Sequence, residues 1–301
     1  MPQPRVVAAT LLAALVCVPA AGLAYVRSTT TNTAAPLIWM RSNCVHVRVN
    51  SKGSDDINDG SDVAAAKRSI DNWRKLIGAC SYFKFVVLDD SPDAKPEFTR
   101  SGVNENVIYW EENDWKHDRM AAAITTVFFL EKQGDERDGR ILDADIELNG
   151  RWFHFSSAGT IHKTDVENTV THELGHLMGL DHPCDDGARQ PVPKDHTGAT
   201  IPSCTTVLGS TSDPKYAAMR DTTMFNFADP GETKKRSPEA DDVKGICEIY
   251  PTAQAPSACE PVSYDENNGG CDVGGSPPPL ASLLIWALLL GLPLAARRRS
   301  G

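Results

Sequence analysis

Apolar and polar residues follow two different periods along this chain of 301 residues, and the periods separate strands from helices. Short runs rich in β-branched and aromatic residues predict strands at 45–49, 82–88, 107–111, 124–130 and 141–148. Residues 62–77 instead repeat apolar residues at helical spacing, which predicts a helix with Val63, Ile70, Trp73 and Ile77 on its buried face. Together these elements predict an α+β fold in which a mixed sheet is backed by helices.

A second helical pattern begins near Thr164. Thr164 and Glu167 have the spacing of a capping box, in which the two side chains satisfy free N–H groups of the first helical turn. Apolar residues then recur at every fourth position, at Val166, Val170 and Leu174. Gly179 is typical of a helix end, because glycine adopts the left-handed conformation of a C-terminal cap without strain. We therefore expect the chain to turn back at this glycine.

Candidate metal ligands lie on this helix and just after it. His172 and His176 are four residues apart, so both imidazoles lie on one helix face and can aim at a common point. After the turn at Gly179, His182 returns toward that point from another direction. Three imidazoles are a typical ligand set for a catalytic zinc ion, which keeps one position for water. Glu173 can reach that water without being a ligand and is the candidate general base.

The full spacing is what separates this motif from a chance match. A bare His-Glu-x-x-His is only suggestive, because it also occurs in helices whose histidines are structural. Gly179 and His182, at the required offsets behind a capped amphipathic helix, favour the metal site and indicate a metallopeptidase. The histidines at 154, 162 and 196 have no such context, and we expect each to be structural or exposed.

The extended motif resembles that of the metzincins, zinc endopeptidases that also carry a methionine-containing turn beneath the metal. The resemblance implies that residues 221–225 form this turn and that Met224 lies below the three imidazoles. Met219 is the competing methionine. The segment that follows the turn would form a wall of the substrate pocket, and Phe225 and Phe227 would make that wall apolar.

Within the metzincins the chain is most similar to the matrixin branch. A closing helix is predicted from Ser237 to Tyr250, because Ser, Pro and acidic residues at its beginning are typical start signals. Asn226 stands where astacins carry a tyrosine, Pro183 stands where adamalysins usually carry an aspartate, and the calcium-binding repeats of serralysins are missing. The stretch between the third histidine and the turn methionine is longer than in a matrixin.

The resemblance covers roughly residues 36–251 and implies further details of the sheet. Residues 141–148 would be the edge strand above the cleft, where a peptide binds as an added antiparallel strand. Acidic residues in and before this strand are candidates for a structural calcium site as in matrixins, although an ordinary acidic turn accounts for them equally well. These residues are Asp135, Glu136, Asp138, Asp143 and Asp145.

The N-terminus is typical of an exported protein. Arg5, an apolar run and small residues up to Ala24 are the features of a secretory signal peptide, predicted at 1–24. Residues 25–39 are too few for a folded prodomain and contain no cysteine that could occupy the zinc, as matrixin prodomains do. We therefore expect synthesis without such an inhibitory prodomain.

The C-terminus carries an anchoring or sorting signal. Residues 280–296 are an uncharged stretch between three prolines and the arginines 297–299, long enough to cross a bilayer. Together with Cys271, this tail at 280–299 resembles the sorting signals of certain bacterial surface proteins. The resemblance implies contact with the membrane before any processing and transfer to the cell surface, and a permanent single-pass anchor is the alternative.

An exported chain normally pairs its cysteines. Of the eight cysteines, Cys17 would leave with the signal peptide and Cys271 would serve the tail, so six remain to pair. The preferred pairing is Cys44 with Cys80, Cys184 with Cys204 and Cys247 with Cys259, and sequence alone leaves other arrangements open. A zinc–thiolate cluster is the rival interpretation, but no Cys-x-x-Cys pair supports it.

Charge and length set further limits. A formal net charge of -10, from 40 acidic against 30 basic residues, disfavours a nucleic-acid partner, because no basic surface is available for phosphates. The basic run at 234–236 is interpreted as a solvated loop.

Residues 36–251 suffice for one catalytic domain with a substantial core, and 252–279, rich in Pro, Gly, Asn and Ser, are predicted to be a flexible linker. We expect a monomer.

These features predict a secreted or surface-anchored zinc endopeptidase that acts on protein or peptide substrates. In the expected mechanism, Glu173 accepts a proton from a water activated by zinc and passes it to the departing amine. Two alternatives stay open. A non-catalytic adhesion or binding module on a peptidase-like scaffold would have no need for Glu173 beside three ligands, and a zinc hydrolase could act on a bond other than a peptide.

Overall fold

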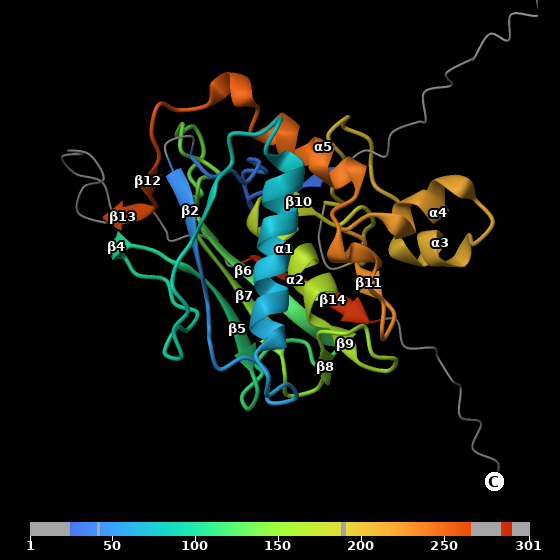
Figure 1. Ribbon diagram of the computed structural model, residues 1–301. Helices are drawn as coiled ribbons and strands as arrows, with labels where there is room; N and C mark the ends of the chain where they lie inside the picture. Colours follow the sequence, from blue (N-terminus) through green and yellow to red (C-terminus); the bar gives the residue numbers. More distant parts are fainter. Residues whose placement is uncertain (1–24, 41–42, 188–190, 266–283, 291–301) are drawn as a thin grey trace, which may run out of the picture.

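A twisted mixed sheet is the frame of the computed structural model, which describes residues 25–40, 43–187, 191–265 and 284–290 (Figure 1). The predicted signal peptide, with Cys17, and the predicted sorting cysteine Cys271 lie outside the described residues. Helices cover one face of the sheet, so the structure has the mixed, α+β character that the sequence pattern predicts.

Five strands form the body of the sheet, and the predicted runs at 45–49, 82–88, 107–111, 124–130 and 141–148 each overlap one of them. Their spatial order is β3 (Phe85–Val87), β2 (Asn43–Val49), β5 (Asn106–Glu111), β7 (Ile141–Asn149) and β6 (Ala121–Phe129). β3, β2, β5 and β7 are parallel, whereas β6 is antiparallel to β7. Alternate residues of these strands enter the main apolar core beneath the helices.

The expectation that residues 141–148 form the edge strand is wrong. β7 pairs with β5 on one side and with β6 on the other. Among the five body strands, β6 is the last and the antiparallel one. Its other side pairs with β14 (Leu284–Leu290), and β14 in turn pairs with β11 (Phe227–Ala228). Both β6 and β7 are apolar and buried along most of their length, so periodicity alone does not separate the edge strand from its neighbour.

Two helices pack side by side on one face of the sheet. α1 (Ser61–Ile77) confirms the predicted helix at 62–77, and α2 (Val166–Leu177) carries the first two histidines of the motif. Trp73 of α1 donates a hydrogen bond from Nε1 to the carbonyl of Thr171 at 2.9 Å, and Ser69 donates from Oγ to the carbonyl of Glu167 at 3.0 Å. These two bonds fix the position of α2 relative to α1.

The chain after α2 folds around a second, smaller apolar cluster. β10 (Leu180–Asp181) follows the helix, and α3 (Cys204–Gly209) and α4 (Pro214–Asp221) fill the long stretch before the predicted methionine turn (Figure 1). The cluster consists of Cys184, Cys204, Val207, Met219 and Phe225. The closing helix α5 (Ala240–Ile249) begins later than Ser237, because the short 3-10 helix η1 (Lys234–Arg236) precedes it and Glu239 is its N-cap.

Segments on both sides of the predicted domain pack onto it. β1 (Val26–Arg27) pairs with β10, and residues 252–265, predicted as the beginning of a linker, contain η2 (Thr252–Gln254), β12 (Glu260–Pro261) and β13 (Ser263–Asp265). β12 pairs with β2, and Val262 is buried in the main core. Two short pairings complete the architecture, β13 with β4 (Ser101–Val103) and β8 (Phe155–Ser156) with β9 (Thr164–Asp165).

Three disulfides are present among the described residues, which indicates an oxidising compartment. Cys184–Cys204 confirms one predicted pair. The other two predicted pairs are wrong, because Cys44 bonds to Cys259 and Cys80 bonds to Cys247. The topology explains the exchange: β12 lies beside β2 and brings Cys259 to Cys44, while α5 packs against α1 and brings Cys247 to Cys80.

The predicted membrane-crossing stretch at 280–296 is described only in its middle. Residues 284–290 form the strand β14 rather than part of a helix. Within the described part of the chain, no helix has the length and apolar character needed to cross a bilayer. The remainder of the stretch and the arginines 297–299 lie outside the described residues.

Two of the five acidic calcium candidates meet on the sheet face that points away from α2. Asp143 and Asp145 of β7 are fully buried, and Asp145 accepts a hydrogen bond from the backbone N–H of Val107 at 2.7 Å. Burial raises the pKa of both carboxyls, and the neighbouring acid raises that of Asp145 further. Asp135 pairs with Arg137 in an exposed turn instead.

The structure therefore does not assemble the five acids into a calcium site. Asp138 accepts hydrogen bonds from Thr33 and the backbone of Lys132, while Glu136 is exposed. Among the described residues, the three motif histidines form the one group of three His, Cys, Asp or Glu ligands close enough to hold a metal ion. The buried acids Asp143 and Asp145 are a pair.

We predict that Asp143→Asn stabilises the protein at alkaline pH. Because the folded-state pKa of this carboxyl lies above its ordinary value of 3.8, the folded protein binds more protons than the unfolded chain above about pH 4, and stability falls as pH rises toward the raised pKa. The amide does not ionise, so Tm should rise by about 3 °C or more at pH 8 and by less at pH 5.

Thermal unfolding at the two pH values, with the exposed Glu136→Gln as the matched control, measures this effect. The control should leave both midpoints unchanged. A loss of stability in Asp143→Asn at both pH values would contradict the prediction.

Candidate metal centre

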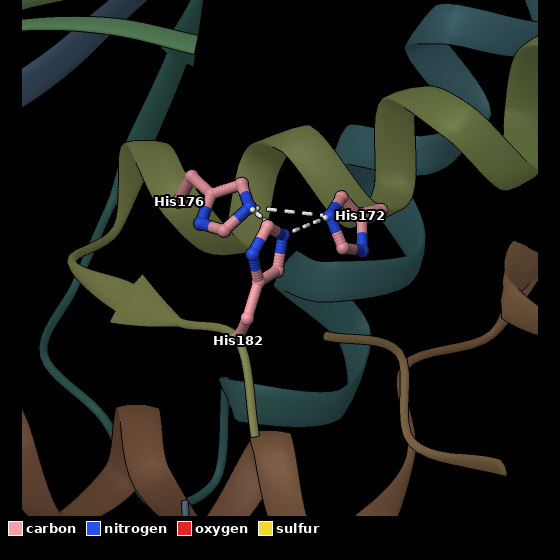
Figure 2. A group of neighbouring side chains, drawn as sticks. All are labelled: His172, His176 and His182. Atoms are coloured by element: carbon pink, nitrogen blue, oxygen red, sulfur yellow. Dashed lines mark hydrogen bonds between the residues drawn. The ribbon is translucent and has the colours of Figure 1, made fainter. Parts of the chain in front are cut away.

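The three motif histidines converge on one buried point. His172 and His176 extend from α2, and His182 extends from the chain directly after β10 (Figure 2). Their Nε2 atoms lie 3.1 to 3.2 Å from one another, and the exposed fractions of the three residues are 0%, 0% and 4%. The predicted ligands are therefore brought together by the fold.

The outer nitrogens of two rings are held by backbone carbonyls. Nδ1 of His172 lies 2.7 Å from the carbonyl oxygen of Thr223, and Nδ1 of His176 lies 3.0 Å from that of Leu180. A carbonyl only accepts, so each Nδ1 is the protonated donor and each Nε2 carries a lone pair. Burial is the main factor that lowers the pKa of His172, with smaller contributions from His176 and Lys235. The neutral ring is the form that binds a metal.

The donor set fits a zinc ion. Unprotonated nitrogens at this separation repel one another unless a cation lies between them. Zn–N bonds of about 2.0–2.1 Å in a tetrahedral arrangement place neighbouring nitrogens about 3.3 Å apart, close to the separations of 3.1 to 3.2 Å seen here. Three nitrogen donors also leave one tetrahedral position free.

The turn that returns His182 to the site depends on glycine. Gly179 has φ +96°, in the left-handed region, and a Cβ at this position would lie 3.0 Å from the carbonyl oxygen of Leu37. Ser28 donates hydrogen bonds from its N–H to the carbonyl of Gly179 and from Oγ to that of Leu180. The N-terminal segment therefore fixes the backbone from which His182 extends.

The beginning of α2 differs from the predicted capping box. Asp165, not Thr164, is the N-cap, and its side chain accepts from the backbone N–H of Asn168 at 2.9 Å. Glu167 bonds to Arg68 of α1 instead of capping the helix. Asp165 also pairs with Arg236, so one carboxylate joins the start of the histidine helix to η1.

Glu173 is fully buried next to the first histidine on α2. Its Oε2 accepts a hydrogen bond from Thr125 Oγ1 of β6 at 2.7 Å, while Oε1 has no hydrogen-bond partner among the described residues. Burial raises the pKa of Glu173 to about 8 in the protein without a metal. A cation held by the adjacent histidines favours the carboxylate and opposes this shift.

The predicted methionine turn packs directly beneath α2. Met224 is 2% exposed and belongs to the main core, whereas Met219, the competing choice, lies in the smaller cluster. A Cβ on Gly175 would lie 2.2 Å from the Sδ of Met224, so the side chain fits against the helix only because residue 175 is glycine. The preceding residue, Thr223, receives the Nδ1–H of His172 and donates its own N–H to Asp242 at 2.7 Å.

The interpretation of residues 234–236 as a solvated loop is wrong. Lys235 is 0% exposed, and its Nζ donates hydrogen bonds of 2.7 Å to the carbonyls of Phe225 and Phe227. Burial lowers the pKa of Lys235 to about 7. The lysine is buried because the backbone after the methionine turn offers two unpaired carbonyls, and it thereby holds the predicted pocket wall in place.

Sequence reasoning missed Thr125, Lys235 and Asp242. Each contacts the site from an element far away in sequence, and the only local signals are a polar residue within an apolar strand and an acidic first turn of α5. Elsewhere the expectation for the remaining histidines is confirmed. His154 and His162 are exposed, and His196 stacks on Tyr25 with ring centroids 4.2 Å apart.

Compared with known protein families and with curated proteins, the chain matches none. The site itself therefore carries the functional argument. The buried group of three histidines can hold a metal ion, and the buried carboxylate of Glu173 follows the first of them in sequence. This arrangement is suited to a metal-dependent hydrolase.

We predict that Gly175→Ala weakens both the metal centre and the fold. The added methyl group displaces Met224 and, through it, the carbonyl that orients His172, so zinc affinity should fall about tenfold or more. Overpacking of this kind costs typically about 1–3 kcal/mol of stability. Competition titration with a zinc chelator and thermal unfolding measure the two effects.

Gly209→Ala is the matched control, because no atom lies within 4 Å of its added Cβ. It should leave zinc affinity and Tm close to those of the parent protein. Equal behaviour of the two variants would show that the packing of Met224 against α2 does not support the site.

Proposed function

We propose that this protein is a zinc-dependent endopeptidase of the metzincin type, most similar to the matrixins, that acts in the extracellular space or at the cell surface. The observation that carries the proposal is the convergence of the Nε2 atoms of three histidines beside the buried carboxylate of Glu173. The turn containing Met224, packed against Gly175 beneath the histidine helix, supports the metzincin assignment.

His172, His176 and His182 hold the zinc ion in this proposal. When bound, zinc supplies Lewis-acid activation of a water molecule and of a peptide carbonyl. The carbonyls of Thr223 and Leu180 keep the rings of His172 and His176 in the tautomer that presents Nε2. The ligands are thus oriented by the backbone before any metal binds.

Glu173 transfers the proton from the attacking water to the departing amine in this proposal. Thr125 donates to its Oε2, which fixes the side-chain orientation and leaves Oε1 without a partner from the described residues. Oε1 accepts the proton of the attacking water, and the resulting acid returns it to the nitrogen of the departing amine. The buried setting excludes bulk water from competing for this proton.

The sheet and the disulfides support a peptide substrate outside the cytoplasm. β6 is the last of the five body strands, antiparallel to β7, and contacts Glu173 through Thr125, so a peptide paired with β6 in place of β14 would run past the metal centre. Backbone pairing of this kind accepts many sequences. Three disulfides suit an exported protein.

The alternative of a non-catalytic adhesion or binding module makes no use of Glu173. Burying a carboxylate costs desolvation energy, and only one oxygen of Glu173 recovers part of it through a hydrogen bond. A purely structural role gives no reason to bury an acid at this cost. A zinc hydrolase of non-peptide bonds is a second alternative. It predicts that the zinc-loaded protein cuts no member of a diverse peptide library.

We predict that Glu173→Ala keeps zinc and loses turnover. The variant removes the proton acceptor but none of the three nitrogens, so zinc per chain should stay at the parent value while kcat falls by about a hundredfold to ten-thousandfold. Metal analysis and cleavage of unfolded casein, with and without chelator, measure the two quantities on one sample.

Glu136→Ala, in the exposed turn between β6 and β7, is the control and should behave as the parent protein does. Full activity in zinc-loaded Glu173→Ala would refute the role assigned to this residue. Zinc binding without cleavage in the parent protein would favour the binding-module alternative.

A further inference from the structure

The chain's own C-terminal segment lies where a peptide would pair with the sheet. β14, with the sequence Leu-Ile-Trp-Ala-Leu-Leu-Leu, runs antiparallel to β6, with Leu284 opposite Val127 and Leu289 opposite Ala121. On its other side it runs parallel to β11, with Leu289 opposite Phe227. We call the space between β6 and β11 the slot. β14 pairs with β6 along most of its length and with β11 at its C-terminal end, Leu289 and Leu290.

The slot lies beside the metal centre. Trp286 of β14 is paired with Thr125, the residue whose hydroxyl bonds to Glu173. The opposite wall, β11, begins three residues after Met224, and Lys235 holds it through the carbonyls of Phe225 and Phe227. Figure 1 shows β14, in red, next to the histidine helix α2 and ending beside β11.

We propose that the slot is the peptide-binding surface of this metal centre and that residues 284–290 occupy it as an intramolecular inhibitor. This inference rests on the proposed endopeptidase function and adds its regulation. With β14 in place, the backbone N–H and C=O groups of β6 that would bind a substrate are already paired. A substrate has to displace the segment before it reaches the metal.

Two physical reasons make 284–290 a strong competitor. The segment has no charged residue, so its pairing in the slot desolvates no charge. It is also covalently attached, and a tethered segment acts at an effective concentration on the order of millimolar. The slot therefore fits extended, uncharged, apolar segments.

The same residues form the middle of the uncharged stretch 280–296. One segment cannot lie in a bilayer and in the slot at the same time. Any step that withdraws it, whether proteolytic removal or insertion into lipid, frees the slot for substrate. The C-terminal segment would then keep the enzyme inactive. This is consistent with residues 25–39, which contain no cysteine that could occupy the zinc.

The test breaks the β6–β14 pairing within the full chain. Ile285→Pro combined with Trp286→Pro removes two consecutive N–H groups, one of which faces β6 whatever the register, and introduces a ring that a paired strand does not accommodate. Ala281→Pro combined with Ser282→Pro is the matched control, because it places the same change in the tail before the described strand.

Two readouts are measured on the zinc-loaded full chain and on both variants. Amide hydrogen exchange across 121–127 reports whether the free side of β6 is paired, independently of activity. Cleavage of a peptide library reports kcat/KM. The inference predicts that the 285/286 variant loses protection in 121–127 and gains about tenfold or more in kcat/KM, while the control matches the parent.

The outcomes separate this inference from the proposed function. Lost protection with unchanged, measurable cleavage would overturn the inhibitory role alone. Unchanged protection in the 285/286 variant, or an equal loss in the control, would overturn the occupancy of the slot by β14. Lost protection with no cleavage in any zinc-loaded form would overturn the endopeptidase assignment itself, and with it the inhibition.

Discussion

The structure depends on one electrostatic constraint: the Nε2 atoms of three imidazoles converge in a buried place. The Nε2 atoms of the motif histidines lie 3.1 to 3.2 Å apart with almost no exposure to water. The Nε2 lone pairs of His172 and His176 repel each other at 3.1 Å, and a cation bound between the rings turns the arrangement into a coordination site. The surrounding scaffold therefore holds the rings together against their own repulsion.

Each part of the scaffold fixes the orientation of one or two of the histidine rings. The helical period of α2 aims His172 and His176 together, and the left-handed turn at Gly179 reverses the chain so that His182 meets them. Carbonyls of Thr223 and Leu180 select the tautomer. The N-terminal segment, α5 and the methionine turn hold those carbonyls, which is why elements distant in sequence all meet at this helix.

What could be predicted from the sequence was the local part of this account. Spacing along a helix identified the three ligands and Glu173, and apolar periodicity located α1 and the five main strands. The errors concern choices made in three dimensions. Disulfide partners depend on which elements pack together, and the edge strand could not be recognised because β14 covers β6, which then has the apolar pattern of a central strand. Lys235 looked like a surface residue because its two carbonyl partners lie outside its own loop.

The most direct measurement of the central claim is X-ray absorption at the zinc edge of the zinc-loaded protein. The account predicts one zinc per chain with nitrogen and oxygen neighbours at about 2.0–2.1 Å and the multiple scattering of coordinated imidazole. Replacement of His182 by Gln should remove one imidazole from that signal. Failure to retain zinc, or a shell of sulfur neighbours at about 2.3 Å, would contradict the account.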